Sequence, residues 1–530
     1  MTETTTPPSV VSVPTGASRS QEQFRKYIPF TICACLYLVP FVRLFLVGTD
    51  EGTLDYGAVR VFHGQVFARD FFEVIGPGTF YWLAMFFKLF GVSFLATRIC
   101  LFLTSLGTAV LMYFLSRRVC RTNQVLPCII LAGTIVGGLW PAISHHIDST
   151  FFALLAVACI IVWLDRPKPL LLFVAGALAG LTTAFLQPKG MLLFCAFVVW
   201  LWILHRRRLT SLDTVGFVTG GYVSVVGLIL LYFWSKGALG SLIFVNLIWP
   251  SQHYGSVNSV TYAHGLISIY WDHFVIDENG LRWTYGVAAL VIVPLLFVAA
   301  LPVILLALGA RSRWRIARPE ILLLWLCGGA IWLSELHRMD MPRLVFGSPL
   351  LIILCIHLLA EYRGRIANLS LQALSIASVC LLAVNLLSML LAGQTVKTRV
   401  GSVEMLKTAP VLTYLMEHVA PGEEIFVYPY APRYYFFSST TNPTPYSILV
   451  YNYNTPSQFQ EVVRILEQHK VKYVLWDSNF AQATTDVFPG ATVLPPGGLI
   501  VEPYLESHYK QVDVADGVRI MERKSDANAR

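Results

Sequence analysis

Long apolar segments recur along most of the chain, and this recurrence constrains the fold more than any other feature. Several segments reach the roughly 17–25 residues that a helix needs to cross the hydrocarbon core of a bilayer. Only 13% of the 530 residues are charged, and 55% are hydrophobic, whereas soluble domains carry roughly 25% charged residues. So little polar surface predicts a multi-pass, all-α integral membrane protein.

Hydropathy places eleven candidate spans, each an apolar run bounded by polar or turn-forming residues. They are 28–47, 94–115, 125–142, 150–164, 170–186, 190–204, 215–234, 283–308, 321–336, 344–360 and 371–392.

Basic residues cluster in alternate connections between these spans, and acids and histidines occupy the others. Because Lys/Arg-rich connections face the cytoplasm, we expect a cytoplasmic N-terminus and, after an odd number of spans, an external C-terminus. The formal net charge of +8 then reflects topology, and we expect no nucleic-acid partner. The pattern is typical of a bacterial inner membrane, although a membrane of the endoplasmic reticulum would be topologically equivalent. The basic connections include Arg25, Arg117, Arg166, Arg206, Arg311 and Arg363, and the opposite ones include Asp50, Asp148, Asp272, Asp277, Glu278 and Asp340.

The apolar segment 77–92 breaks this alternation. It is short for a span, starts at a Gly-Pro-Gly sequence and contains Lys88. Counting it as a span would move every later basic connection to the outside. We therefore predict an interfacial or re-entrant helix on the outer face, with residues 55–64 as a second such segment. The alternative is a true span with a compensating miscount elsewhere.

The composition divides the chain into three parts. Residues 1–27 are polar and predict a disordered cytoplasmic tail, and residues 28–396 form the predicted transmembrane domain. Residues 397–530 contain no span. There, β-like runs at 424–428 and 472–476 flank a helical pattern at 456–469, which predicts a small extracytoplasmic α/β domain. The ten cysteines show no disulfide or CxxC pattern.

The first external connection is the most informative stretch for function. Asp50 and Glu51 follow the first span directly. A carboxylate pair at a membrane boundary can supply a general base, a metal ligand or a solvated helix end, and the residues alone leave these three interpretations open.

Beyond this pair, the loop resembles the first loop of GT-C membrane glycosyltransferases. It is most similar to the protein O-mannosyltransferase and lipid A aminoarabinose transferase superfamily, in particular to its bacterial branch of lipopolysaccharide galacturonosyltransferases. The resemblance is strongest over roughly the first 200 residues and weakest in the C-terminal part. It rests on Asp50-Glu51, Gly64, Arg69-Asp70-Phe71-Phe72, Gly76-Pro77-Gly78, Phe90-Gly91, Ser93 and Arg98.

This resemblance implies an inverting transfer of a sugar from a polyprenyl-phosphate carrier to a glycolipid, glycan or protein acceptor at the outer membrane face. It implies that Asp50 is the general base, that Glu51 orients the acceptor or a metal ion, and that Asp148 is a second acid. Proximity of Asp50 and Glu51 should raise the pKa of one of them, which suits a base.

The leaving phosphate requires cations near the outer face. Candidates for substrate binding are Arg69, Asp70, Glu73, Lys189, Arg338, Asp340 and Arg343, with Arg98 as a further cation. Lys189 could instead be a lysine whose ammonium reaches the interface, and the arginines around Asp340 could form a structural ion pair. The sequence His145-His146-Ile147-Asp148 also allows a metal site. The cofactor is therefore left unknown, with a divalent metal ion held by Glu51, His145 and His146 as one option.

Two other functional classes compete. A transporter or flippase of glycolipid intermediates would carry ionisable residues near the bilayer midplane, whereas here the acids gather at one face. A non-catalytic assembly subunit would have no need of the Asp50-Glu51 pair.

Overall fold

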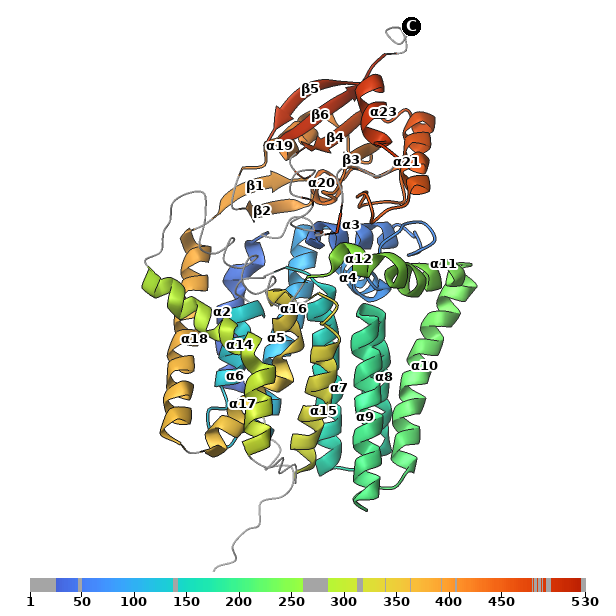
Figure 1. The fold of residues 1–530 in the computed structure, drawn as a ribbon. Helices are drawn as coiled ribbons and strands as arrows, with labels where there is room; N and C mark the ends of the chain where they lie inside the picture. Colours follow the sequence, from blue (N-terminus) through green and yellow to red (C-terminus); the bar gives the residue numbers. More distant parts are fainter. Residues whose placement is uncertain are drawn as a thin grey trace, which may run out of the picture.

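The computed structural model comprises a bundle of helices with a mixed α/β region at one end of the bundle (Figure 1). It describes residues 25–45, 50–136, 142–260, 285–311, 318–338, 340–362, 364–391, 393–405, 408–478 and 497–525, together with residues 480, 484, 488, 490 and 491. Most of the predicted N-terminal tail and the predicted external acids Asp272, Asp277 and Glu278 lie outside the described residues.

A helix is present in each of the eleven predicted spans. Six helices are long and apolar enough to cross a membrane, and four shorter segments are also apolar. The chain is thus an integral membrane protein, as predicted. The long helices are α5 (Phe94–Val119), α7 (His145–Asp165), α9 (Gln187–Arg206), α10 (Asp213–Ser235), α14 (Tyr285–Arg311) and α18 (Arg365–Leu391); the shorter ones are α2 (Ile28–Leu38) with the 3-10 helix η1 (Val39–Arg43), α8 (Pro169–Phe185), α15 (Pro319–Leu333) and α17 (Pro349–Tyr362).

Three predicted spans differ from a single continuous α-helix. In the first, α2 is followed by the 3-10 helix η1. The third consists of α6 (Leu126–Leu131) and a π-helical turn over Ala132–Val136. The tenth is divided into α16 (Met341–Gly347) and α17. α17 begins at a proline, Pro349. Just before it, Gly347 packs against the backbone of Trp332, so closely that a Cβ atom on Gly347 would lie 3.0 Å from the Trp332 Cα atom. Hydropathy does not register such breaks, because the residues on both sides of them are apolar.

The end of the bundle opposite the C-terminal region carries the basic residues. Arg118 pairs with Asp165, and the Arg318 side chain donates to the carbonyl oxygen of Arg118 at 3.3 Å. Arg117 lies over the ring of Tyr27 at 5.2 Å. Connections far apart in the sequence therefore meet at one end of the bundle, as the alternation of charge predicted.

Two short helices after the first span lie against the other end of the bundle: α3 (Asp50–Phe62) and α4 (Pro77–Phe90). The Phe72 N–H, before α4, donates to the carbonyl oxygen of Pro445 at 2.9 Å, and the Phe94 N–H, after α4, donates to that of Val400 at 2.8 Å. Both ends of α4 thus contact the C-terminal region, so α4 does not cross the bundle. This agrees with the interfacial prediction and contradicts the alternative of a true span.

Cysteine labelling can test this placement in membranes. We expect His63→Cys and Ser93→Cys, which flank α4, to react with an impermeant thiol reagent from the same side, in a background without the ten native thiols. Both residues have accessible surface. Gly76 is unsuitable, since a Cβ atom there would lie 2.4 Å from the Ala184 carbonyl oxygen. Labelling from opposite sides would show that α4 spans the bilayer.

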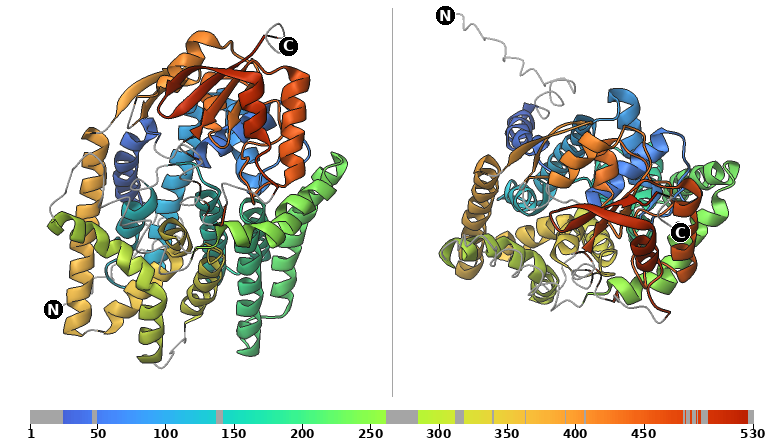
Figure 2. Two further views of the ribbon diagram at one scale, coloured as in Figure 1. Left: turned by 45° about the horizontal axis from the view of Figure 1, so that its top comes forward. Right: turned by 90° about the horizontal axis from the view of Figure 1, so that it is seen from above.

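The C-terminal region contains two sheets that lie across the end of the bundle (Figure 2). The β-like runs and the helical pattern predicted from the sequence are present as β3, α21 and β4, and β3 and β4 pair in parallel around their crossover helix. Strands β5 and β6 extend this sheet in the order β3-β4-β6-β5. The strands are β1 (Gln394–Thr398), β2 (Gly401–Met405), β3 (Ile425–Tyr428), β4 (Tyr473–Asp477), β5 (Tyr509–Ala515) and β6 (Val518–Arg523), and the helices are α19 (Pro410–His418), α20 (Arg433–Ser438), α21 (Pro456–His469) and α23 (Val501–His508).

Helix α20 packs directly on the first turn of α3. A Cβ atom at Gly52 would lie 2.6 Å from the backbone nitrogen of Arg433, so only glycine allows this approach. The rings of Tyr56 and Tyr435 stack at 4.7 Å. The first loop and the C-terminal region therefore form one packed unit.

Candidate active site

Asp50 is the first residue of α3, where the N-terminal end of a helix favours a negative charge. Its side chain is exposed. The hydroxyl of Tyr430, which follows β3, donates to Asp50 Oδ1 at 3.1 Å. The predicted base thus lies at the junction of the first loop and the C-terminal region.

Glu51 points the other way, into the protein. Its Oε1 atom accepts from Arg98 Nη1 at 2.6 Å and from the Ile143 N–H at 3.1 Å, and the side chains of Glu51 and Arg98 are both 0% exposed. The Arg98 guanidinium also lies 4.3 Å from the centre of the Phe94 ring. This ion pair joins α3 to α5. Arg98 was expected to meet phosphate, and in the structure its near partner is Glu51.

Asp55 lies one helical turn beyond Glu51 and is fully buried. Among the described residues, neither of its carboxyl oxygens has a hydrogen-bond partner. Burial first, and then the charge of Glu51, raise the pKa of Asp55 well above its usual range. Burial also raises the pKa of Glu51, against the lowering effect of Arg98. The pKa of Glu51 is raised, as expected for one residue of the Asp50-Glu51 pair, but the largest cause is burial. The carboxyl group that interacts with Glu51 in the interior is that of Asp55, four positions further along α3.

Glu73 is a buried carboxyl group close to Asp50. Burial raises the pKa of Glu73 to about 8, and the charge of Asp50 adds to this effect. Ser447 and Arg60 oppose it. Arg60, itself buried, donates to the carbonyl oxygens of Asp70 and Thr444 at 3.1 and 3.3 Å, and so ties the loop to the C-terminal region.

The raised pKa of Glu73 gives a pH dependence of stability. A carboxyl group whose pKa is raised on folding stabilises the protein fully below its unfolded pKa of about 4.3, and this contribution is lost as the pH rises through about 8. Between these two pKa values the free energy of unfolding should fall by up to about 1.4 kcal/mol per pH unit. We expect Glu73→Gln, which resembles the protonated acid, to remove this dependence. Thermal unfolding in detergent at several pH values measures it, with the exposed Glu506→Gln as control. An unchanged slope in Glu73→Gln would contradict the assignment.

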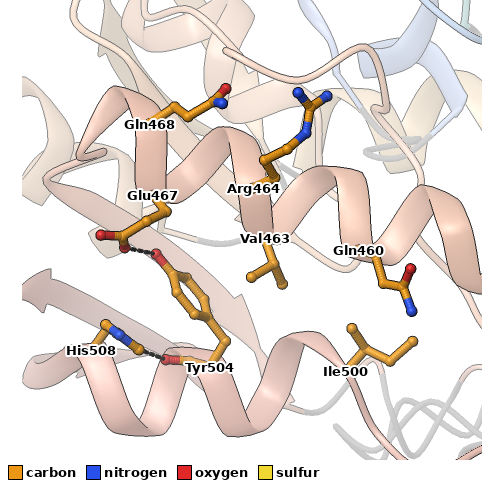
Figure 3. A pocket seen from close by; sticks show the side chains of 8 residues that line it. All are labelled: Gln460, Val463, Arg464, Glu467, Gln468, Ile500, Tyr504 and His508. Carbon is orange, nitrogen blue, oxygen red and sulfur yellow. Dashed lines mark hydrogen bonds between the residues drawn. The ribbon is translucent and has the colours of Figure 1, made fainter.

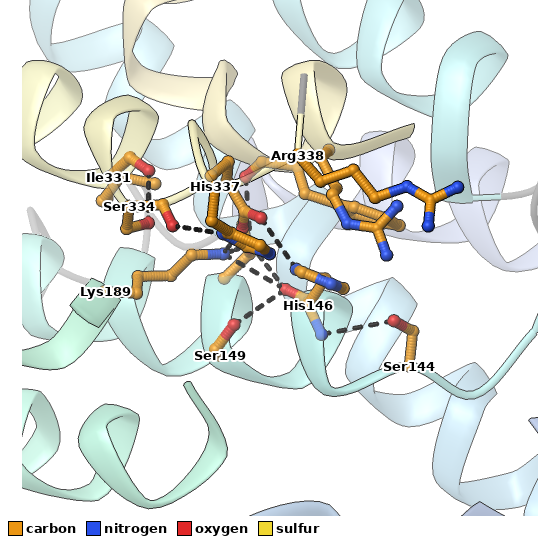
Figure 4. A network of polar contacts seen from close by, with 12 residues as sticks. Ser144, His146, Ser149, Lys189, Ile331, Ser334, His337 and Arg338 are labelled. Atoms are coloured by element: carbon orange, nitrogen blue, oxygen red, sulfur yellow. Dashed lines mark hydrogen bonds and ion pairs between the residues drawn. The ribbon is translucent and has the colours of Figure 1, made fainter. Parts of the chain in front are cut away.

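A second buried polar cluster joins α7, α9 and the turn after α15 (Figure 4). Lys189 Nζ, at the start of α9, lies 2.7 Å from Glu335 Oε1, and His146 Nδ1, in the first turn of α7, lies 2.9 Å from Glu335 Oε2. Lys189 also donates to Thr150 Oγ1 at 2.9 Å. Because Lys189 and Glu335 are both 0% exposed, the alternative of a lysine that reaches the interface is wrong.

Asp148, the expected second acid, follows His146 by two residues. It is 3% exposed, and its Oδ2 atom accepts from the Thr79 hydroxyl of α4 at 2.8 Å. The contact holds α4 against α7, so Asp148 joins elements in this structure. Its predicted role as an acid remains a prediction.

The remaining predicted substrate-binding residues pair with one another. Asp340 Oδ2 lies 2.7 Å from Arg338 Nε and also contacts Arg343 Nη1. Arg69 pairs with Asp70 at 2.8 Å on the exposed side of the loop. Each of the five cations proposed for phosphate therefore has a carboxylate partner, and Arg338 and Arg343 meet at the same carboxylate.

The metal candidates Glu51, His145 and His146 are not gathered. Among the described residues, no three His, Cys, Asp or Glu side chains are placed to hold one metal ion. Glu51 faces Arg98 and His146 faces Glu335, so Glu51 and His146 contact different partners. The structure thus gives no support to a site built from these three residues.

A groove of about 460 Å³ lies between α21 and α23 (Figure 3). No residue of the first loop lines it. The Tyr504 hydroxyl donates to Glu467 Oε2 at 2.9 Å, and the ring of Tyr504 stacks with that of His508. Its lining residues are Gln460, Val463, Arg464, Glu467, Gln468, Ile500, Tyr504 and His508.

Sequence reasoning missed three groups of this site. Glu335 could have been suspected as an acid at the end of an apolar span, and Asp55 as the residue one helical turn after Glu51. Tyr430 gave no local signal, because its contact with Asp50 spans 380 residues of the chain.

Known proteins resemble this chain mainly in fold. Residues 75–235 match the family model described as dolichyl-phosphate-mannose-protein mannosyltransferase. No curated protein matches the chain significantly in sequence. Two solved structures share the fold: ArnT from Cupriavidus metallidurans bound to undecaprenyl phosphate, and the archaeal oligosaccharyltransferase AglB from Archaeoglobus fulgidus in complex with an inhibitory peptide and a dolichol-phosphate.

The ArnT match has a TM-score of 0.57 at 12% identity and covers 94% of this chain and 98% of ArnT. The AglB match has a TM-score of 0.50 at 14% identity and covers 95% of this chain and 77% of AglB. The resemblance predicted from the first loop is therefore confirmed, and the chain is a membrane protein of the GT-C fold whose residues 75–235 match the protein mannosyltransferase family.

Proposed function

We propose that the chain is an inverting glycosyltransferase that moves a sugar from a polyprenyl-phosphate carrier to an acceptor at the membrane face that carries the C-terminal region. The observation that carries the proposal is the exposed Asp50 carboxylate, fixed by Tyr430 at the start of α3. Asp50 occupies the position at which the resemblance to GT-C glycosyltransferases predicts the general base. The lipid carriers named for the ArnT and AglB structures support a donor of this class.

In this reaction the acceptor hydroxyl oxygen attacks the anomeric carbon of the donor sugar. A carbon–oxygen bond forms to the acceptor while the bond from the anomeric carbon to the phosphate oxygen breaks, and the phosphate leaves with the electron pair. The acceptor proton passes to Asp50. Exposure of Asp50 suits this role, because a base must reach the hydroxyl within hydrogen-bond distance.

The leaving phosphate gains negative charge and needs cations that are not fully neutralised. Arg338 and Arg343 both contact the carboxylate of Asp340, so two guanidinium groups lie close together there. The pairs of Lys189 with Glu335 and of Arg98 with Glu51 are each balanced within themselves. We therefore assign the phosphate first to the Asp340 group and keep Lys189 as a weaker candidate.

We also propose residues 28–396 as the catalytic transmembrane domain and residues 397–530 as an extracytoplasmic domain. The setting that fits best is a bacterial inner membrane with the site on its periplasmic side. A glycolipid, a glycan or a protein hydroxyl could be the acceptor. The opposite placement of the basic connections and the C-terminal region supports this orientation.

Mass spectrometry of envelope glycolipids and glycoproteins, with and without the gene, tests the function. We expect one sugar modification to disappear on deletion and to return with the wild-type chain, while its polyprenyl-linked donor accumulates in the deletion strain. An unchanged set of envelope sugars in cells that express the protein would contradict the proposal.

A further inference from the structure

The hydroxyl of Tyr430 lies between two polar groups of α3. It donates to Asp50 Oδ1 at 3.1 Å and accepts from the Thr53 hydroxyl at 3.2 Å. A tyrosine hydroxyl carries one proton, and an ionised carboxylate can only accept. The proton of Tyr430 must therefore point to Asp50, and the proton of Thr53 must point to Tyr430. The three groups form a chain with a fixed direction.

The ring of Tyr430 is held independently of this chain. Tyr430 is 3% exposed, and its ring centre lies 5.9 Å from that of Phe480 and 6.3 Å from that of Phe488. These contacts place the hydroxyl before any substrate arrives. By contrast, the Asp50 carboxylate is exposed and would rotate in solvent without a partner.

From this geometry we propose that Tyr430 is a positioning residue that holds Asp50 through Oδ1 and leaves Oδ2 to take the proton of the acceptor. The proposal rests on the proposed glycosyl transfer. It assigns to the C-terminal region a part of the active site, since the residue that orients the base comes from the segment after β3. It also predicts that the transmembrane part alone would carry a poorly oriented base.

Other charged and titratable groups also lie around Asp50 and Tyr430. Glu73, from the loop before α4, lies close enough for the charge of Asp50 to raise the pKa of Glu73. Arg433, the first residue of α20, lies beside the first turn of α3 through its backbone contact with Gly52. Tyr453 lies near Tyr430. A hydrogen bond to the charged form of a carboxyl favours that form, which gives the test its readout.

The test uses the full-length protein in native membranes, which supply donor and acceptor, and follows transfer of labelled sugar against pH. We expect Tyr430→Phe, which keeps the ring, to lower kcat roughly tenfold with little change in KM. We expect it to move the acidic limb of the kcat/KM profile to higher pH. Thr53→Val should shift this limb in the same direction but less, and should add nothing in the Tyr430→Phe background.

The matched control is Tyr451→Phe, because Tyr451 also donates its hydroxyl to a carboxylate, Glu502, at 2.8 Å within the C-terminal region. We expect this variant to change thermal stability without moving the pH profile. A Tyr430→Phe protein that folds and keeps the wild-type profile would overturn the positioning role, as would an additive effect of Thr53→Val. Absence of transfer by wild-type membranes would instead contradict the proposed function itself.

Discussion

Replacing Asp50 by asparagine is expected to lower sugar transfer by about 10²–10⁴-fold, the usual cost of losing a positioned general base. The amide keeps the shape of the carboxylate and can still accept from Tyr430, but it cannot take the acceptor proton. Because Asp50 is exposed and has no part in the buried ion pairs, folding should be nearly unchanged. The measurement is transfer of labelled sugar from a membrane lipid extract to the native acceptor.

Asp516→Asn is a suitable control for this variant. Asp516 is exposed in the turn between β5 and β6 and has a positive φ of 50°, which asparagine also adopts readily. We expect normal transfer from this control, and binding of undecaprenyl phosphate by both variants. Near wild-type turnover of Asp50→Asn would remove the catalytic role, and Asp50 would then be only the solvated end of α3.

Apolar periodicity and basic residues were enough to predict most of the fold. The spans depend on local composition, and an extended apolar run has few alternatives in a membrane. Segment 77–92 was recognised because a span there would have reversed the charge pattern. The strands β1, β2 and β5 were missed because most of their residues are exposed or half-exposed, so they carry little hydrophobic alternation. In β6, Ile520 and Met521 are both buried although they are adjacent, which interrupts the alternation.

The candidate site could be predicted only where the chemistry is local. Asp50 and Glu51 are adjacent in sequence, but which of them faces solvent is decided by Arg98, 47 residues away. Lys189 was identified as a candidate cation near the outer face, whereas its partner Glu335 comes from the turn after α15. Paired charges of this kind depend on tertiary packing, so a single sequence shows the candidate but not the partner that neutralises it.

Removing the Lys189 ammonium should give the largest loss of stability. Lys189→Met leaves the Glu335 carboxylate buried without its lysine partner, and breaking a buried pair from one side typically costs about 3–5 kcal/mol. Glu335→Gln in the same protein removes the orphaned charge and keeps a hydrogen-bonding group for His146. We therefore expect the double variant to recover much of the stability, measured by thermal unfolding in detergent.

This pair of variants also separates the two interpretations of Lys189. If Lys189 only balances Glu335, the double variant should bind undecaprenyl phosphate as well as the wild type does. If its ammonium receives the donor phosphate, the double variant should fold normally and yet bind the lipid more weakly, because no cation has been restored. Lys236→Met, at an exposed lysine, is the control for removal of one positive charge. A Lys189→Met protein of unchanged stability would show that the ion pair with Glu335 contributes nothing to the fold.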